Sequence, residues 1–500
     1  MASLTTPELI KVASEATAPA LTAKLGIEPG GVDPLGLRQI NFNLMDMVLP
    51  GLNNVACRIR PFTVMAWAWR RAALCSGQDG ETPDAVLDFV ARIEVIFVWS
   101  QLQLHPNAAL PGRDVLQQLV KAEQFTFGGP EWERMRLKRE ESTALSAAVN
   151  YGPALKSLGW VERTQYRGIY KPSEITAAAL NALDGSMGDH LRHEAFSKFG
   201  RVTVTSKDVD AWGKIWDLGS PCQEEQMAMT ASFQGSRASE ARRQGAALIV
   251  DAVDRHEGPW TEQEIRVSLC GAPTSYTPPS ALLITAGHWR AVQARQLFRL
   301  GLEALLHWVM LRLDRPRPLE SLAAAFLADV ESAGNTRSWL AIREGNTASL
   351  PDRIQCLEDA LKKNDNSGEL SRAIHGALGA SLAESVRGNS PEQSDRLPLG
   401  RAKRETEALG ARPPLEWVSH VLGSWVLGQH LYWSVGRGLG DARGNGKRIL
   451  RLKVVPEEGG WTLAPGATVN VSNRPRPTPD RLGTALSLMA EAGMFVGKAQ

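Results

Sequence analysis

Hydrophobic positions recur every three to four residues along most of the chain, which is the period of an α-helix with one buried face. The clearest examples are 60–75, 85–104, 239–256, 289–313, 319–333 and 415–433. The segment 85–104 is apolar nearly all round, so we expect it to be a central core helix. The pattern as a whole predicts a mainly α fold.

Two short segments break the helical pattern and predict β-hairpins. In the first, a helix ends at Gly159, a strand follows to Val161, residues 163–168 form a tip, and 169–171 return before a new helix. This order of helix, hairpin and helix is similar to the end of a winged-helix module. In the second, residues 449–455 alternate apolar and basic side chains, a turn follows at 456–460, and 461–463 return.

Changes in these patterns divide the chain into five parts. We predict an N-terminal helical domain (1–129), a winged-helix-like module (130–185), a helical domain (186–385), a linker (386–414), and a C-terminal helix with a basic β-hairpin (415–500). The linker is predicted because this segment is polar and rich in turn-forming residues. The sequence therefore predicts a multi-domain helical protein with a winged-helix-like module and a small C-terminal β-hairpin.

Composition excludes two classes of protein. Apolar residues make up 43% of the 500, which is enough to bury a core and excludes a wholly disordered chain. The chain has 56 Lys and Arg residues against 54 Asp and Glu residues, a formal net charge of +2. This balance excludes a protein that binds polyanions through bulk charge, and it leaves only local basic patches for such contact.

Cysteine usage and hydropathy predict a cytoplasmic protein without membrane association. The five cysteines lie far apart and form no CxxC pair, which is typical of reduced, mostly buried thiols. The N-terminus lacks the basic start and apolar core of a secretory signal. The most apolar stretch, 297–313, is interrupted by Arg299, Glu303, His307 and Arg312, so it predicts a buried helix.

Four landmarks along the chain carry a family resemblance. The stretch 33–71 combines a D-x-LG start, a Pro-Gly turn, an arginine-rich helix start and a tryptophan-bearing helix, and three later segments follow it. The residues are Asp33, Leu35, Gly36, Pro50, Gly51, Arg58, Arg60 and Trp69, then Arg92 and Glu94, then Tyr151–Glu162, then the C-terminal QHLYW with its basic strand and EEGGW. Together they resemble an uncharacterised group of bacterial proteins associated with anti-phage defence loci. That group has no assigned catalytic residue, so the resemblance implies a biological setting and not a reaction.

The motifs that would indicate an enzyme are weak. The run 436–448 (GRGLGDARGNGKR) has the wrong spacing for a phosphate-binding loop and no preceding strand. His190 and His193 share a helix face but lack a visible third metal ligand, and no G-x-S-x-G elbow occurs. We therefore predict no cofactor and no metal, and we favour a non-catalytic protein over an enzyme.

Arg92 and Glu94 stand in the otherwise apolar segment 85–104. A buried carboxylate is expected to be paired, so both residues are predicted to belong to a structural ion pair. Candidate partners of Glu94 are Arg58, Arg60, Arg70 and Arg71.

Two basic regions are candidates for nucleic-acid contact. The predicted wing carries Arg163, Arg167 and Lys171, which suit contact with phosphates. In the helix before the wing, only Asn150 and Lys156 are plausible readers of bases. The C-terminal region holds six basic residues against one acid, Asp441, and is expected to present Arg451 and Lys453 on one strand face. Its basic residues are Arg437, Arg443, Lys447, Arg448, Arg451 and Lys453.

These observations favour one function and leave two alternatives. The favoured function is a non-catalytic scaffold subunit of a bacterial multi-protein anti-phage defence complex, which binds other subunits of the same system and contacts the DNA or RNA backbone non-specifically. The first alternative is a DNA-processing effector enzyme with a site built from distant residues. The second is a winged-helix transcriptional regulator.

Overall fold

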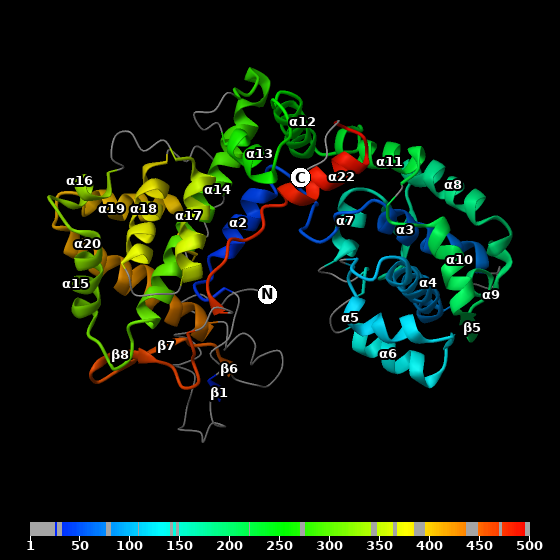
Figure 1. The fold of residues 1–500 in the computed structure, drawn as a ribbon, viewed down its shortest axis with the longest axis horizontal. Helices are drawn as coiled ribbons and strands as arrows, with labels where there is room; N and C mark the ends of the chain where they lie inside the picture. The colour runs from blue at the N-terminus through cyan, green and yellow to red at the C-terminus, as the bar shows by residue number, and fades with distance from the viewer. Residues whose placement is uncertain are drawn as a thin grey trace. The chain divides into compact units, whose positions relative to one another are not determined.

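A computed structural model describes residues 26–27, 33–76, 82–108, 110–140, 144–146, 150–219, 221–270, 276–341, 348–363, 368–384, 396–436, 449–469 and 473–495. The chain divides into two compact units. The first unit comprises Met1–Leu44, Arg266–Thr277 and Ala286–Thr478, and the second comprises Met45–Ile265, Pro278–Thr285 and Pro479–Gln500. Both are mainly helical, which confirms the predicted fold class (Figure 1).

The second unit contains most of the elements in the first half of the chain. Its longer helices are α3 (Arg60–Cys75), α4 (Pro83–Leu104), α6 (Pro130–Glu140), α7 (Tyr151–Ser157), α8 (Ala177–Met187), α10 (Ser206–Ile215), α11 (Gln223–Gln234), α12 (Glu240–Asp254) and α22 (Leu482–Glu491). The short helices are α5 (Arg113–Leu116), η1 (Gln117–Lys121), η2 (Glu174–Thr176), η3 (Gly188–Arg192), α9 (Glu194–Ser197) and η4 (Ser280–Leu282). Its strands are β2 (Gln124–Phe127), β3 (Val161–Arg163), β4 (Tyr170–Pro172) and β5 (Val202–Thr205).

The core of the second unit is built around α4, which packs on α3 and α10. Thr82 caps α4 by accepting a hydrogen bond from the Ala85 backbone N–H, and Pro83 follows at the first turn. The helix is buried along Phe89–Leu102 on several sides, so the expectation of a central core helix is confirmed. Phe196 and Trp216 meet edge to face at 5.9 Å, and Trp67 contacts both rings.

The predicted order of helix, hairpin and helix is present. Helix α7 ends at Ser157, β3 and β4 pair antiparallel, and η2 and α8 follow. Gly159 adopts a φ of +77°, which glycine tolerates without strain, and this turn carries the chain into β3. The second antiparallel pair of this unit, β2 with β5, joins segments far apart in the sequence.

The first unit contains α2 (Arg38–Met45) except for its last residue, together with most of the helices of the second half of the chain. They are α15 (Leu319–Val330), α16 (Thr336–Leu340), α17 (Leu350–Lys363), α18 (Glu369–Ala383), α19 (Leu399–Ala408), α20 (Pro414–His420) and a π-helix, η6 (Val421–Gly428). Its strands are β1 (Gly26–Ile27), β6 (Ile449–Leu450), β7 (Val454–Glu457) and β8 (Gly460–Leu463). Helices α13 (Glu262–Leu269) and α14 (Leu283–Met310) each contain a boundary between the units.

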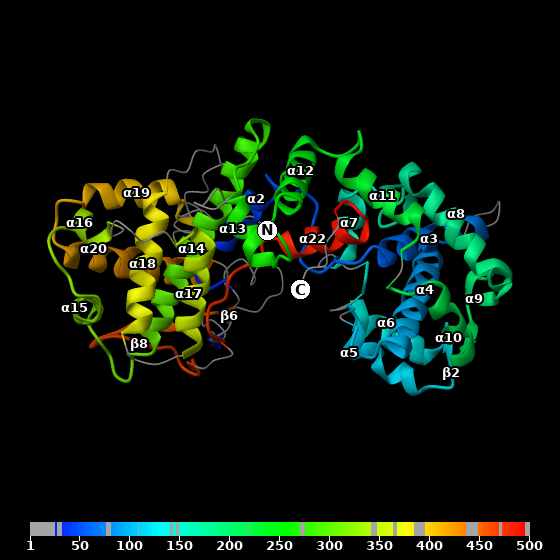
Figure 2. The ribbon, with the colours of Figure 1, turned by 45° about the horizontal axis from the view of Figure 1, so that its top comes forward.

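Helices α14, α17 and α18 supply much of the core of the first unit (Figure 2). Leu297, Leu305 and Trp308 of α14 are buried together with Leu357 of α17 and Leu378 of α18. Gly301 lets α14 approach α18 closely, because a Cβ atom there would lie 3.1 Å from the Leu378 side chain.

The segment 386–414, predicted as a linker, contains helix α19. Leu399 and Ala402 are buried on one face of this helix. One turn after Ala402, the Glu405 carboxylate accepts hydrogen bonds from Arg401 at 2.7 Å and from the Trp425 indole at 2.7 Å, and it lies 2.9 Å from the His420 ring. The buried face could not be recognised in this polar segment, because within α19 only Leu399 and Ala402 form it. Residues 385–395 lie outside the described part of the chain.

The C-terminal hairpin is confirmed as the antiparallel pair β7 with β8. Gly460 has a φ of +122° at its turn, and a Cβ atom there would collide with the Arg317 carbonyl at 2.3 Å. Trp461 forms a bridge with Arg317 through paired backbone hydrogen bonds. Strands β1 and β6 pair in parallel.

Cysteine burial differs from the sequence prediction. None of the five cysteines forms a disulfide, but Cys270 alone is buried, Cys57, Cys75 and Cys222 are half-buried, and Cys356 is exposed. The prediction of mostly buried thiols was wrong, because Cys356 occupies an outward position on the amphipathic helix α17 between buried Ile354 and Leu357. No described helix has both the length and the apolar character needed to cross a membrane.

Candidate functional site: an aromatic cavity beside the β3–β4 hairpin

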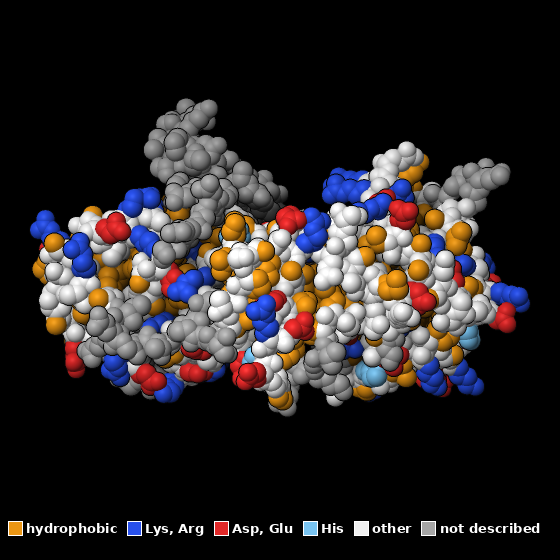
Figure 3. All heavy atoms as spheres, turned by 90° about the horizontal axis from the view of Figure 1, so that it is seen from above, with side chains coloured by type: hydrophobic (Ala, Val, Ile, Leu, Met, Phe, Trp, Pro, Cys, Tyr) orange, Lys and Arg blue, Asp and Glu red, His pale blue; other side chains and the backbone are white. Residues whose placement is uncertain are grey.

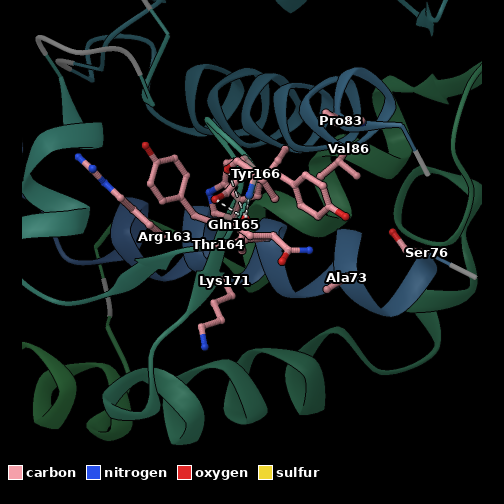
Figure 4. A pocket seen from close by; sticks show the side chains of 12 residues that line it. Ala73, Ser76, Pro83, Val86, Arg163, Thr164, Gln165, Tyr166 and Lys171 are labelled. Atoms are coloured by element: carbon pink, nitrogen blue, oxygen red, sulfur yellow. Dashed lines mark hydrogen bonds between the residues drawn. The ribbon is translucent and has the colours of Figure 1, made fainter. Parts of the chain in front are cut away.

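A cavity of about 740 Å³ lies in the second unit between the β3–β4 hairpin and helices α3 and α4 (Figure 4). Helix α3 contributes Trp69 and Ala73, its C-cap residue Ser76 follows, and helix α4 contributes Pro83 and Val86. The hairpin contributes the residues Arg163–Tyr166 and Ile169–Lys171. A volume of this size is in the range of known ligand pockets.

Helix α3 shapes one wall because its residues Trp69, Ala73 and Ser76 recur at helical spacing on one side. Trp69 is only 5% exposed and anchors this wall, whereas the small side chains of Ala73 and Ser76 leave room above it. Ser76 ends the helix and donates from its hydroxyl to the Ala72 carbonyl at 3.0 Å. The cavity therefore combines one large ring with a recess made by small residues.

Two tyrosines of the hairpin complete an aromatic surface. The Tyr170 ring meets the Trp69 ring edge to face, with centroids 5.5 Å apart. The Lys156 ammonium lies 4.8 Å from the centroid of Tyr170. Tyr166, at the tip of the hairpin, is 56% exposed. An exposed ring beside a partly covered one offers a planar apolar group a place to stack.

The hairpin register decides where its cations point. Arg163 is directly opposite Tyr170, and Glu162 is directly opposite Lys171. Residues paired in this way share a face of the hairpin, so Arg163 and Lys171 extend from opposite faces, as Figure 4 shows. Lys171 is neutralised by Glu162, whose Oε2 lies 3.5 Å from the Lys171 Nζ. The predicted wing therefore does not bring its three cations onto one surface.

Arg163 and Arg167 remain as the cations that flank Tyr166. Both are exposed, and within the part of the chain that the structure describes neither forms an ion pair. The other face of the hairpin is electrically compensated, because Arg237 contacts Glu162 at 3.3 Å and Glu174 at 3.0 Å. On the face drawn in Figure 3, Lys and Arg side chains are likewise scattered among Asp and Glu side chains.

The residues predicted to read bases are engaged within the protein. Asn150 is 7% exposed, and its side-chain amide donates to the Ala144 carbonyl at 2.8 Å. Lys156 lies over Tyr170, as described above. Helix α7 is seven residues long and buries Tyr151, Ala154 and Leu155. It therefore does not present a polar face of the kind that enters a major groove.

The structure gives Arg92 and Glu94 separate partners. The Arg92 guanidinium donates to the backbone carbonyls of Lys198 and Gly200, the latter at 3.1 Å, and burial lowers its pKa to about 10. Glu94 is 2% exposed and accepts hydrogen bonds from the Leu145 backbone N–H and from the Ser146 hydroxyl at 3.1 Å. The two residues are two positions apart on α4 and so point in different directions.

The arginines considered as partners of Glu94 have other ion-pair or carbonyl partners. Arg58 pairs with Glu491 at 2.5 Å, and Arg60 pairs with Glu225 at 3.0 Å. Arg70 pairs with Asp184, and the Arg71 guanidinium donates to the Phe196 carbonyl at 2.9 Å. Sequence spacing alone does not reveal these partners, because they come from helices and loops more than a hundred residues away.

The C-terminal basic region is only partly described. Arg437, Arg443, Lys447 and Arg448 lie outside the described residues. Arg451 and Lys453 are half-buried and precede β7, so the expected exposed strand face is not present at these two positions. The two residues are held inward because backbone hydrogen bonds join this stretch to Ser434 and His430. The Arg451 carbonyl accepts from Ser434 at 3.0 Å, and the Lys453 N–H donates to the His430 ring at 2.9 Å.

His190 and His193 do not meet at a metal site. The His193 ring caps helix α9 by accepting from the Ala195 backbone N–H at 3.0 Å, and it lies 3.8 Å from Asp208. Among the described residues, no group of three or more His, Cys, Asp or Glu side chains is arranged to hold a metal ion.

Sequence reasoning found Arg163 and Arg167 but missed the aromatic cavity beside them. The available signal was Tyr166 within the turn between the two arginines, together with Tyr170 at the start of the return strand. The contribution of Trp69 was not readable, because it comes from a helix that precedes the hairpin by nearly a hundred residues. Comparisons with family models, curated proteins and solved structures found no match for this chain.

Proposed function

We propose that the β3–β4 hairpin and its cavity bind single-stranded nucleic acid without sequence preference. In this proposal the protein is a non-catalytic subunit of a multi-protein complex, and the setting of that complex is anti-phage defence. The setting rests on the resemblance of the sequence landmarks alone. The nucleic-acid contact rests on the geometry of the hairpin.

The observation that carries the proposal is the combination of exposed Tyr166 with Arg163 in the lining of an aromatic cavity, next to the exposed Arg167, which follows Tyr166 in the chain. Among the described residues, neither arginine has an ion-pair partner. An unpaired base stacks on an aromatic ring whatever its identity, and alanine substitution of such rings costs about 1–3 kcal/mol per base. Arginine at the same edge binds the phosphates on either side of the stacked base. Base pairs within a duplex cannot enter the cavity without being unstacked.

The geometry does not favour the regulator alternative. A winged-helix regulator reads bases with the helix before the wing, but Asn150 is buried here and Lys156 is held against Tyr170. Nothing among the described residues favours an effector enzyme over a binding protein, and the enzyme stays an alternative.

Fluorescence anisotropy with labelled oligonucleotides tests the binding. A single-stranded oligothymidine should bind more tightly than a duplex of equal length at low salt. If two phosphates are neutralised, the logarithm of the affinity falls with the logarithm of the salt concentration with a slope of about −1.4. Equal affinity for the duplex, or no binding of the single strand, contradicts the proposal.

Co-expression with the products of neighbouring genes tests the scaffold role. The expected result is a complex that stays together on size-exclusion chromatography. A protein that elutes alone with every neighbour tested contradicts this part of the proposal and leaves the nucleic-acid contact unaffected.

A further inference from the structure

A second cavity, of about 600 Å³, lies within the first unit, between the end of α15 and helices α16, α17 and α18. It is independent of the hairpin site. The residues of its lining that matter here are Trp339 from α16, Arg353 from α17, and Arg372, His375, Gly376 and Gly379 from α18. Helices α17 and α18 run side by side in Figures 1 and 2 and pack closely on each other.

One face of α18 forms the floor of this cavity. Arg372, His375, Gly376 and Gly379 follow one another at the spacing of residues that share a helix face. Gly379 is required for the packing of α16, because a Cβ atom there would lie 2.8 Å from the Leu340 carbonyl oxygen. At Gly376 a Cβ atom would lie 4.0 Å from Arg353 Nη1, so the Arg353 guanidinium extends from α17 across this glycine.

The two arginines bring positive charge that is not balanced by a partner. Within the residues that the structure describes, neither Arg353 nor Arg372 forms an ion pair. Desolvation by burial lowers the pKa of Arg353, which is the direction expected of a cation without a strong counter-charge. Asp329, the carboxylate on the cavity wall, is already engaged by Arg312 at 2.8 Å and by the Ser371 hydroxyl at 2.6 Å. The remaining acid of the lining, Glu331, is exposed at the edge.

A buried hydrogen-bond donor also lacks an acceptor in this lining. Trp339 is 7% exposed, and its indole N–H has no acceptor among the described residues. The His375 ring stacks on Trp339 with centroids 4.2 Å apart, and its Nε2 lies 3.1 Å from the Trp339 carbonyl oxygen. A carbonyl oxygen only accepts, so the His375 Nε2–H donates to it, and burial lowers the pKa of this ring. Other buried indoles of the described residues also lack an acceptor, but Trp339 belongs to this cavity lining, where a ligand can accept from its N–H.

We propose that this cavity binds a phosphate monoester, with the phosphate held by Arg353 and Arg372 and the esterified group lying against the His375 and Trp339 rings. The lining holds guanidinium groups from two helices and an indole N–H, a set of donors that the three terminal oxygens of a phosphate monoester satisfy more fully than the two oxygens of a carboxylate. Gly376 leaves room on the floor for the Arg353 guanidinium, which can meet the anion there.

Isothermal titration calorimetry with phenyl phosphate as the probe tests this proposal on the full chain. We expect binding by the wild-type protein and at least about tenfold weaker binding by Arg353→Gln and by Arg372→Gln, which corresponds to losing one charge-assisted contact. Trp339→Phe keeps an aromatic ring but removes the N–H, so it should weaken binding less than the arginine variants do. Arg404→Gln, at an exposed arginine of α19 outside this lining, is the matched control and should bind as the wild type does.

Two further probes identify what the cavity recognises. Phenol lacks the phosphate and benzoate carries a planar carboxylate, and both should bind at least about tenfold more weakly than phenyl phosphate. Phenol binding equal to that of phenyl phosphate overturns the proposal, because the cavity would then be only apolar. Benzoate binding equal to that of phenyl phosphate overturns the assignment of a phosphate. Unchanged phenyl phosphate binding in both arginine variants, or its absence in the wild type, also overturns the proposal.

Discussion

Arg163 and Tyr170 stand directly opposite each other in the β3–β4 hairpin. This pairing puts a guanidinium that has no ion-pair partner among the described residues beside a ring that contacts Trp69 at 5.5 Å, so charge and aromatic surface share one edge of the cavity. The same register sends Lys171 to the opposite face, where Glu162 neutralises it. One face of the hairpin thus carries Arg163 and Tyr170 beside the cavity. The other face carries Glu162 and Lys171, whose charges balance each other.

Glu94 is expected to be structural. Glu94→Ala should lower the free energy of unfolding by about 1–3 kcal/mol. The buried Leu145 N–H loses its acceptor, and the hydrogen bond from the Ser146 hydroxyl to Glu94 is lost as well. Glu94→Gln keeps one carbonyl acceptor and should cost less. Urea denaturation measures both. A fully stable Glu94→Ala protein that no longer binds nucleic acid would assign a functional role to this residue instead.

Gly36 is expected to tolerate no side chain. It has a φ of +71°, and a Cβ atom there would lie 2.3 Å from the Trp433 ring, which also packs against the Arg396 guanidinium at 4.5 Å from the ring centroid. Gly36→Ala should therefore destabilise the first unit by more than about 1 kcal/mol, since it adds backbone strain to a clash. Gly287→Ala is the control, because nothing lies within 4 Å of a Cβ atom at that helical position. Equal melting temperatures for the two variants would show that Trp433 moves aside freely.

His430 should make the stability of the first unit depend on pH. Burial lowers its pKa to about 4, although the hydrogen bond to the Pro34 carbonyl acts in the opposite direction. The unfolded chain takes up a proton near the ordinary pKa of about 6.5, and the folded chain takes it up only near 4. The contribution of His430 is therefore fully present above about pH 6.5 and is lost as the pH falls to about 4, by up to about 3 kcal/mol.

Denaturation at several pH values checks this window. In His430→Gln the unfolding free energy should fall less steeply between about pH 6.5 and about pH 4 than in the wild type. Identical slopes for the two proteins would show that His430 is not the titrating group.

The cysteines should differ in their rates of alkylation. Cys356 is exposed and should be modified first by iodoacetamide at neutral pH. Desolvation, together with the nearby carboxylate of Glu225, raises the pKa of Cys222 to about 11, so its reactive thiolate is scarce until the solution is strongly alkaline. Mass spectrometry of digests taken over time measures both rates. Modification of Cys222 before Cys356 would contradict the burial of these thiols.

Much of the helical architecture was predictable from the sequence because its signals are local. The period of apolar residues and the Thr82-Pro83 start locate α4, and Gly159 marks the turn into β3. The C-terminal hairpin followed from the alternation of residues 449–455 and the turn after it, although the strand begins only at Val454. The buried side of α19 was missed, because Leu399 and Ala402 are too few to stand out in a polar segment.

The candidate site was predictable only in part, because its walls come from distant segments. The hairpin cations Arg163 and Arg167 were visible in the sequence. The cavity was not, since it requires Trp69 of α3 to meet Tyr170 of β4. The register that separates Arg163 from Lys171 was also hidden, because shifting a hairpin by one residue exchanges its two faces. The partners of Glu94 depend in the same way on tertiary contacts, with residues 145 and 146.

The most direct test of the central claim measures the affinity of single-stranded oligothymidine for Tyr166→Ala and for the double variant Arg163→Gln/Arg167→Gln. These residues are exposed, so the variants should fold as the wild type does. We predict that Tyr166→Ala weakens binding about fivefold or more and that the double variant also flattens the salt dependence. Arg201→Gln, at an exposed arginine of the same unit outside the cavity lining, should bind like the wild type. Wild-type affinity and salt dependence in both hairpin variants would contradict the assignment of nucleic-acid binding to this hairpin.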